Sequence, residues 1–168
     1  KNGCTYTALN VVADALKAEG IDAEVFQAGD PDMENVKAAA AKLKDSDALV
    51  VGSPVYWASP SGQFIEFMDR LASVAGKDML YKPAAAVASR RAGTTATLDV
   101  LTKYFSYHQM PVVSSCYWNM VHGNTPEEVM KDEEGVQIMR VLGKNMAWLL
   151  KCIEAGKKNG VAVPAAED

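Results

Sequence analysis

The stretch from Val50 to Phe64 restricts the possible folds of this chain most. It begins inside a continuous apolar run, Ala48 to Val51, which is typical of a short strand buried on both faces of a sheet. A glycine, two prolines and two aromatic residues follow. Apolar residues then recur at helical spacing, at Phe64, Met68, Leu71 and Ala75. The stretch therefore predicts a buried strand, a loop and an amphipathic helix.

Pro54 cannot continue a central ladder, so we expect the strand to stop near Ser53. Ser59 is available to cap the following helix, with Pro60 at its first position. Tyr56 and Trp57 then lie at the carboxyl end of a strand, where open α/β sheets bind ligands. Alternatively, these two aromatic residues only cover the core.

The same alternation of strand and helix continues along the chain. Thr125 to Glu128 has the pattern of a capping box with proline at the first helical position. We expect strands over 23–27, 48–53, 83–88 and 112–116, and helices after residue 5, from 30 or 32, after 60, after 93, from 126 and over 135–155. This order predicts a doubly wound parallel sheet with helices on both faces. Residues 1–156 are expected to form one domain and 157–168 a loose tail.

Several motifs resemble the NADPH-dependent FMN reductase family of flavodoxin-like proteins. They are Gly52-Ser53-Pro54-Val55-Tyr56-Trp57, the following Ser61-Gly62, Phe67-Met68-Asp69-Arg70, Arg90-Arg91-Ala92-Gly93 and Tyr117-Trp118-Asn119. The likeness extends over nearly the whole chain. It implies a flavodoxin-like fold, FMN as cofactor and NADPH or NADH as electron donor. It also implies a small electron acceptor, such as a quinone, a flavin or an iron chelate. The alternative is a flavodoxin-type carrier that binds FMN and exchanges electrons with proteins.

The resemblance also implies where FMN binds. The phosphate is expected at the turn before the first helix, the ring against the aromatic loop, and its other edge near the loop after residue 88. The implied cofactor-binding residues are Asn2, Gly3, Cys4, Thr5, Pro54, Val55, Tyr56, Trp57, Ser61, Gly62, Ser89, Arg90, Arg91, Ala92, Gly93, Thr94, Tyr117 and Trp118. No catalytic side chain is implied, because flavin N5 accepts the hydride.

Elementary chemistry supports a phosphate at the first of these places. Free backbone N–H groups and the positive end of the helix dipole meet at a helix N-terminus, and the Thr5 hydroxyl adds a donor. The other interpretation is that Thr5 is only an N-cap. In the resembled family a central strand precedes this turn. The sequence begins at the turn itself, so either the sheet is built another way or that strand lies outside these residues.

Composition argues against several other functions. The net charge of −4 and the pI near 5.2 provide no basic surface for nucleic acid. Cys4, Cys116 and Cys152 are too widely spaced for a disulfide framework, a zinc site or an iron–sulfur cluster. No apolar stretch is long enough to cross a membrane. We therefore expect a cytoplasmic protein with reduced thiols and no metal.

Large aromatic and apolar residues are frequent in the expected loops and at helix ends. A monomer would expose many of them, and exposed patches of this kind usually mark contact surfaces. The residues are Tyr56, Trp57, Tyr104, Tyr107, Tyr117, Trp118 and Met120. We expect a homodimer or homotetramer whose interface includes Trp118 or Trp57 and lies beside the flavin.

Overall fold

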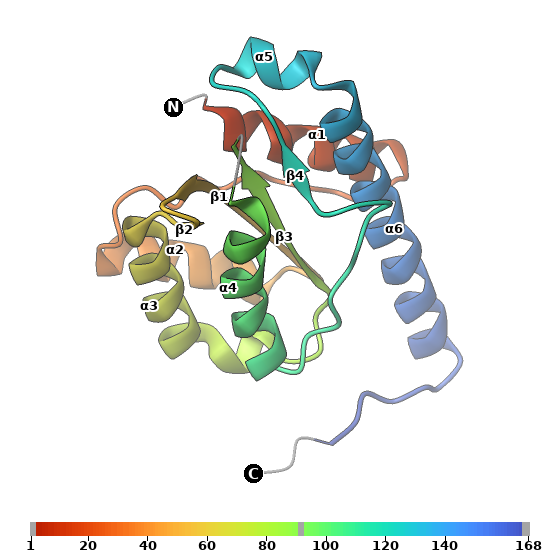
Figure 1. Cartoon of the computed structure of the whole chain (residues 1–168). Coiled ribbons are helices and arrows are strands. Elements are labelled where there is room, and N and C mark those ends of the chain that lie inside the picture. Colours follow the sequence, from red (N-terminus) through yellow and green to blue (C-terminus); the bar gives the residue numbers. More distant parts are fainter. Residues whose placement is uncertain (1–2, 91–92, 166–168) are drawn as a thin grey trace.

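A computed structural model describes residues 3–90 and 93–165 of the chain. Figure 1 shows a small central sheet with helices on both sides. The elements are α1 (Cys4–Ala18), α2 (Met33–Lys44), β1 (Leu49–Tyr56), β2 (Ser59–Pro60), α3 (Gly62–Met79), β3 (Ala84–Ser89), α4 (Thr94–Tyr107), β4 (Met120–Val121), α5 (Pro126–Lys131) and α6 (Glu133–Lys158). This alternation confirms the expected α/β class.

The sheet has the strand order β2-β1-β3-β4. β1 and β3 are parallel over their full common length, from Leu49 opposite Ala84 to Pro54 opposite Ser89. β3 is also parallel to the short β4, whereas β2 returns antiparallel to β1. The carboxyl ends of β1 and β3 therefore lie side by side at one edge of the sheet.

Two separate hydrophobic cores lie on the two faces of the sheet. α2, α3 and α4 form one core with Val51, Ala84 and Ala86, and α1, α5 and α6 form the other with Ala85 and Val87. All six residues of β3 are buried. The small alanine side chains let helices pack closely on both faces, as the sequence predicted.

The expectation that the strand stops near Ser53 was wrong, because β1 continues through Pro54 to Tyr56. Leu49 donates its N–H to the Pro83 carbonyl, and every second residue of β1 after it faces β3 in the same way. Pro54 is not in that set, so the N–H that proline lacks would point away from β3 and no ladder bond is lost. The predicted helix start was also wrong. Residues 59–60 form β2, and Ser61 caps α3 by accepting a bond from the N–H of Phe64.

The strand expected over 23–27 is absent. The segment from Ile21 to Ala28 lies beyond the free edge of β1 without regular secondary structure. Its alternating pattern persists in its packing, since Ile21 and Ala23 contact the α1/α6 core and Phe26 and Ala28 contact the α2/α3 core. A strand needs a hydrogen-bonded neighbour, and no described backbone group pairs with this segment as a ladder.

The strand expected over 112–116 is reduced to an isolated bridge between Val112 and Ala84. Val112 pairs with Ala84, and the next pairing joins Met120 to Ala88. The chain thus advances eight residues from Val112 to Met120 while β3 advances only four. The surplus residues bulge out of the sheet. Ser115 Oγ donates to the Ile138 carbonyl at 2.7 Å, and Asn145 Nδ2 donates to the Ser114 carbonyl at 2.8 Å, so α6 holds the bulge.

Two of the four helix starts with side-chain caps were predicted. Asp32 caps α2, and Thr125 caps α5 with Pro126 at the first position. α6 runs longer than expected, and the predicted tail begins only after Lys158. Among the described residues, no helix is both long and apolar enough to cross a membrane.

Candidate functional site

Two helices begin without a side-chain cap, and both begin at the carboxyl edge of the sheet. Gly3 precedes α1 and Gly93 precedes α4, and neither can offer a capping oxygen. The other four helices each have a cap from Asp32, Ser61, Thr125 or Asp132. First-turn N–H groups without intrahelical partners attract anions. α1 and α4 thus direct backbone donors and positive dipole ends toward the predicted site.

The start of α1 is joined to the end of β3 through side chains. The hydroxyl oxygens of Thr5 and Ser89 lie 2.6 Å apart. Thr5 lies inside α1, so the interpretation of Thr5 as an N-cap was wrong. Close approach depends on Gly52, because a Cβ there would lie 2.9 Å from Thr5 Cγ2 and 3.0 Å from Leu9 Cδ1.

The predicted aromatic loop is a tight hairpin between β1 and β2. Trp57 and Ala58 both have positive φ, 53° and 58°, as a two-residue type I′ turn requires. The Trp57 side chain is 97% exposed. A non-glycine residue in this conformation costs about 1 kcal/mol or more. Trp57 contributes almost no buried surface to the fold, so its strained backbone is not offset by packing. This combination is typical of a binding surface.

The loop after β3 holds this hairpin from the side. Arg90 Nη1 donates to the Val55 carbonyl at 3.3 Å. Gly93 has φ of 73°, and a Cβ on it would lie 3.1 Å from Ala58 Cα. The two loops that the sequence predicted to border the ligand are therefore in direct contact.

A buried serine fixes the other end of the hairpin. Ser53 Oγ accepts the N–H of Ser61 at 3.1 Å and donates to the Pro54 carbonyl at 2.8 Å. Ser53 is fully buried. Its hydroxyl thus links the last residues of β1 to the start of α3, and it sets the path of the aromatic loop between them.

A cavity of about 2430 Å³ opens beside these elements. It brings together most of the predicted site. The predicted residues that line it are Gly3, Cys4, Thr5, Pro54, Val55, Tyr56, Ser61, Gly62, Ser89 and Arg90. Asn2, Arg91 and Ala92 lie outside the described residues. Trp57, Gly93 and Thr94 are close in the chain but do not line the cavity.

Tyr117 and Trp118 lie elsewhere than the prediction placed them. They project from the bulge before β4, their ring centroids are 4.9 Å apart, and the cavity lining does not include them. Thr94 is buried, and its hydroxyl donates to Met120 Sδ at 3.1 Å. Met120 and Tyr104 are also less exposed than expected, because Met120 packs in the core and the Tyr104 hydroxyl donates to Asp69.

Many residues that line the cavity were not predicted as site residues, and Tyr6, Gln63 and Gly123 are those among them beside the predicted phosphate and ring positions. Gly123 lies beside the first turn of α1, where its carbonyl accepts the Cys4 thiol at 3.5 Å. The sequence could have indicated Gly123, because its loop follows the strand expected over 112–116 and such loops border the ligand in open α/β sheets. Burial, together with the charges of Glu128 and Glu127, raises the pKa of the Cys4 thiol, so it stays protonated near neutral pH.

The fold has relatives among solved structures. A flavodoxin from the domain Archaea aligns with a TM-score of 0.70 at 17% identity, covering 90% of this chain and 93% of that one. A WrbA-like flavodoxin from Agrobacterium tumefaciens aligns with a TM-score of 0.67 at 20% identity, covering 88% and 90%. RosB, in a structure with bound 8-demethyl-8-formylriboflavin-5'-phosphate, aligns with a TM-score of 0.73 at 14% identity, covering 100% and 85%. The flavodoxin-like fold is thereby confirmed.

A sequence relative is named for an iron–sulfur cofactor, which the cysteines of this sequence can be tested against. An iron–sulfur flavoprotein of Methanocaldococcus jannaschii is 29% identical over 179 aligned residues, covering 90% of this chain and 93% of that one. Such clusters are usually held by four cysteine thiolates. This sequence has three cysteines, and the described residues contain no group of three potential metal ligands. The cysteines in the described part of the chain therefore do not fit a four-thiolate cluster.

The family model of the NADPH-dependent FMN reductases matches residues 1–125. The matched region contains every element of the candidate site described above, from the uncapped start of α1 to the loop of Gly123. This chain therefore belongs to the NADPH-dependent FMN reductase family, a group of FMN-binding flavodoxin-like oxidoreductases.

Proposed function

We propose that this protein is an FMN oxidoreductase that takes a hydride from NADPH or NADH and passes electrons to a small acceptor. Quinones, free flavins and iron chelates are the acceptor classes. The observation that carries the proposal is that the uncapped start of α1 and the hairpin residues Val55 and Tyr56 line one cavity. The uncapped start of α4 lies beside the same hairpin, where Gly93 meets Ala58. FMN supplies the redox chemistry when it is bound, and the protein supplies binding and orientation.

The first turn of α1 holds the phosphate in this proposal. Its backbone N–H groups and the Thr5 hydroxyl are donors, and the turn itself contains no acidic residue. The carboxylates whose charges reach Cys4, those of Glu127 and Glu128, belong to α5. Gly3 leaves open space, because a Cβ on it would contact nothing within 4 Å. The binding of riboflavin phosphate derivatives by the structural relative RosB is consistent with this assignment.

The hairpin of β1 and β2 and the loop after β3 hold the ring. Negative charge gathers at the pyrimidine end of a reduced flavin, and backbone N–H groups of residues 55–57 and 93–94 can stabilise it. Arg90 adds a positive charge at the same edge, and Arg91 is a second candidate from the sequence. Arg90 also bonds to Val55, so its first task is to position the hairpin.

The charge around the site favours an enzyme over an electron carrier. Carriers of the flavodoxin type tend to surround FMN with acidic loops that dock basic partners. Neither residues 53–64 nor residues 89–97 contain an acidic residue, and the second range contains Arg90 and Arg91. A small acceptor needs only an open ring face, and Tyr56 and Trp57 give such a face aromatic borders.

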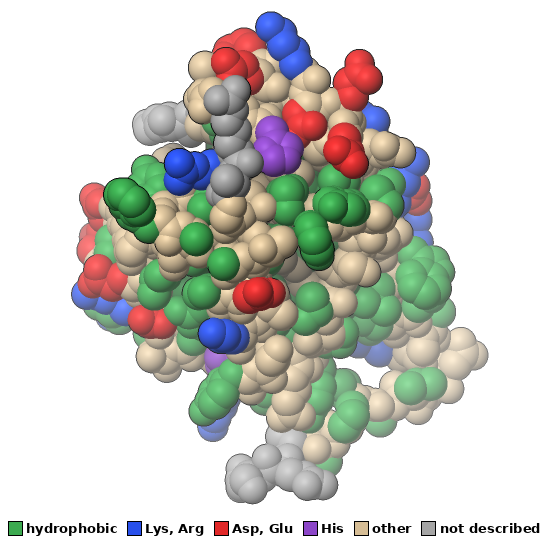
Figure 2. All heavy atoms as spheres, in the orientation of Figure 1, with side chains coloured by type: hydrophobic (Ala, Val, Ile, Leu, Met, Phe, Trp, Pro, Cys, Tyr) green, Lys and Arg blue, Asp and Glu red, His purple; other side chains and the backbone are tan. Residues whose placement is uncertain are grey.

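The proposal includes a homodimer or homotetramer. Figure 2 shows hydrophobic side chains gathered in patches on one face of the molecule, among polar ones. The exposed large residues include Tyr56, Trp57, Tyr107, Tyr117, Trp118 and Trp148. A neighbouring subunit that covers Trp118 or Trp57 would also wall the flavin. The proposal further includes one FMN-binding domain over residues 1–156, and a cytoplasmic location that suits the free thiols of Cys4, Cys116 and Cys152.

The test begins with FMN added to the purified protein, followed by NADPH or NADH and each class of acceptor. We expect quenching of FMN fluorescence at micromolar protein, and then oxidation of the nicotinamide cofactor that depends on both FMN and acceptor. A protein that leaves FMN fluorescence unchanged contradicts the cofactor assignment. A protein that binds FMN but supports no turnover with either nicotinamide cofactor contradicts the enzyme assignment.

A further inference from the structure

The first turn of α1 is held at two neighbouring points. Thr5 contacts Ser89 at the end of β3 through their hydroxyl groups. Cys4, the residue before Thr5, donates its thiol to the carbonyl of Gly123 at 3.5 Å. Gly123 belongs to the loop that follows β4, and β4 lies beside β3 in the sheet. Two adjacent residues of α1 are therefore tied to the ends of two adjacent strands.

Two carboxylates hold the loop of Gly123 from the other side. Glu128 Oε2 accepts the backbone N–H of Asn124 at 2.7 Å and the side-chain Nδ2 of the same residue at 3.0 Å. Asp132 Oδ2 accepts the N–H of His122 at 2.7 Å, while its Oδ1 caps α6. The residues on both sides of Gly123 are thus fixed by side chains that follow them in the chain.

The bond to Glu128 sets the direction of the Gly123 carbonyl. The N–H of Asn124 and the C=O of Gly123 belong to one peptide group, and in a trans peptide the two point in opposite directions. Because Glu128 holds the N–H on the side of α5, the carbonyl faces α1, where Cys4 donates to it. The position also requires glycine, since φ is 152° and a Cβ would lie 2.7 Å from the nitrogen of Val129. α5 therefore sets the second anchor of α1.

This use of Glu128 differs from an ordinary capping box. In that motif the glutamate bonds to the N–H of the cap residue, which is Thr125 in α5. Glu128 instead reaches past Thr125 to Asn124. The cap itself is kept, because Thr125 Oγ1 accepts the N–H of Glu128 at 3.3 Å. The carboxylate of Glu128 thus serves the loop before the helix.

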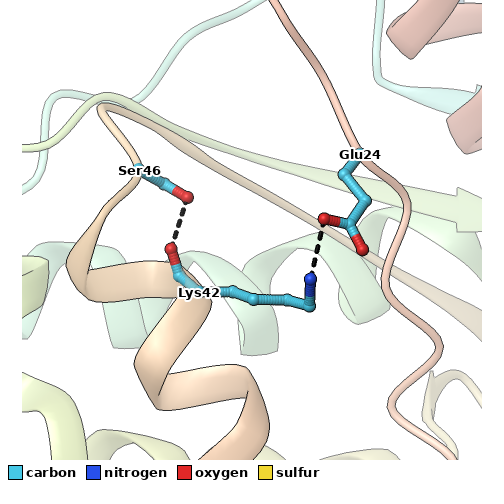
Figure 3. Close-up of polar contacts among 3 residues, drawn as sticks. All are labelled: Glu24, Lys42 and Ser46. Atoms are coloured by element: carbon cyan, nitrogen blue, oxygen red, sulfur yellow. Dashed lines mark hydrogen bonds and ion pairs between the residues drawn. The ribbon is translucent and has the colours of Figure 1, made fainter.

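Four glutamates elsewhere on the surface are used differently. Figure 3 shows one of them, Glu24, in an ion pair with Lys42 at 2.8 Å. The others also pair with basic side chains, and they are Glu19, Glu66 and Glu154. Exposed ion pairs of this kind contribute little to stability. By contrast, the two carboxylates beside Gly123 accept from backbone N–H groups and so fix the course of the chain.

We propose that Glu128 is a positioning residue for the phosphate end of the flavin site, with Asp132 in support. The role rests on the proposed function, in which the first turn of α1 binds the phosphate. Glu128 acts through the Gly123 carbonyl and the Cys4 side chain, and not by contact with the phosphate. Its negative charge repels a phosphate, so loss of the charge alone would tighten FMN binding. Loss of its hydrogen bonds should weaken FMN binding, which gives the positioning role the opposite sign.

Two variants of Glu128 separate its hydrogen bonds from its charge. Glu128→Gln keeps an oxygen that can accept both bonds from Asn124, and Glu128→Met keeps the length of the side chain without that acceptor. Both variants lose the same charge. Flavin fluorescence measures the affinity of each folded variant for FMN and for riboflavin, which lacks the phosphate. We expect FMN affinity to be about fivefold or more lower in Glu128→Met than in Glu128→Gln, as for loss of one hydrogen bond, with equal riboflavin affinities.

A readout without flavin tests the contact between α1 and the loop. The infrared S–H stretch of a thiol shifts when the thiol donates a hydrogen bond, and Cys4→Ala identifies the Cys4 band among those of the three cysteines. Glu128→Met should shift this band, because the Gly123 carbonyl is no longer directed at the thiol. Glu128→Gln should leave the band in place.

Three results would overturn the positioning role in a wild-type protein that binds FMN. They are equal FMN affinities in the two folded variants, a parallel loss of riboflavin affinity in Glu128→Met, and an S–H band that Glu128→Met does not move. If Glu128→Met does not fold, Asp132→Asn replaces it, since an asparagine leaves one acceptor oxygen for two donors. An unchanged ratio of FMN to riboflavin affinity in Asp132→Asn would then contradict the role. A wild-type protein that binds no FMN contradicts the proposed function, and with it any role toward the phosphate.

Discussion

The hydroxyl groups of Thr5 and Ser89 lie 2.6 Å apart and join the first turn of α1 to the last residue of β3. One hydroxyl of such a pair donates, and the other can direct its proton to a ligand. In the proposed function Ser89 accepts or shares this bond, and Thr5 is a donor to the phosphate at the α1 N-terminus.

Replacing Thr5 with Val should weaken FMN binding by about tenfold or more, because a hydrogen bond to a charged group is worth about 1.5–3 kcal/mol. Fluorescence titration with FMN measures the change. Ser89→Ala is the matched control, since it breaks the pair and keeps the Thr5 hydroxyl. Equal FMN affinity in Thr5→Val and wild-type protein would show that Thr5 serves the fold alone.

Gly52 should tolerate no side chain. A Cβ there would meet Thr5 and Leu9 at 2.9–3.0 Å, so Gly52→Ala should cost about 1–3 kcal/mol in the free energy of unfolding. Urea denaturation without FMN measures the loss. Gly62→Ala is the control, because a Cβ at Gly62 contacts nothing within 4 Å. Similar urea midpoints for the two variants would mean that α1 can move away from β1.

Arg90 should act mainly by positioning the hairpin. Arg90→Met removes its bond to the Val55 carbonyl, and we expect FMN affinity to fall by about two- to tenfold, as for loss of one exposed hydrogen bond. Arg90→Lys separates geometry from charge. If Lys restores wild-type affinity, the charge near the flavin matters and the bond to Val55 does not.

The hydrogen bond between Tyr104 and Asp69 should make the free energy of unfolding fall as the pH rises into the alkaline range. Burial, and then the hydrogen bond and charge of Asp69, raise the pKa of Tyr104 above its ordinary value of 10. The folded pKa exceeds the unfolded one, so this stabilisation is complete below about pH 10 and is lost as pH rises further.

Tyr104→Phe should flatten that alkaline loss of stability. Thermal melts between neutral pH and about pH 11 measure it. Tyr107→Phe is the control, because Tyr107 is 84% exposed and its hydroxyl has no described partner. If the melting temperature of Tyr104→Phe falls with alkaline pH as steeply as that of the wild type, the Tyr104 hydroxyl does not cause the decline.

Trp118→Glu should weaken both assembly and NADPH turnover if a neighbouring subunit covers the bulge before β4. Light scattering measures the mass, and steady-state NADPH oxidation measures the turnover. Ser106→Glu is the control, because it places the same charge on an exposed residue near the end of α4, far from Gly93, and it should change neither. A concentration-independent mass near 18.1 kDa for wild-type protein, with normal FMN reduction, would contradict the oligomer.

Local sequence signals predicted the parts of the fold that depend on neighbours in the chain. Asp32 and Thr125 were recognisable as caps, and the apolar runs of β1 and β3 as buried strands, because each signal lies within a few residues of the feature it specifies. The loops that meet at the site followed from strand direction, since parallel strands end at one edge.

Non-local contacts decided the rest. The segment over 23–27 has a strand pattern, but it pairs with no strand among residues 3–90 and 93–165, and sequence alternation alone does not provide a partner. The run over 112–116 leaves β3 because Ser115 and Ser114 bond to residues of α6 that are 23 and 31 positions away. The place of Tyr117 and Trp118, outside the cavity lining, depends on that bulge.

The most direct test of the account is the absorbance spectrum of the FMN-loaded protein, recorded without oxygen before and after addition of NADPH. We predict that the oxidised flavin bands are bleached in one two-electron step, without a semiquinone, and return when a quinone is added. A spectrum that stays oxidised with NADPH and with NADH, while a one-electron chemical reductant produces a stable semiquinone, would contradict the enzyme and identify an electron carrier.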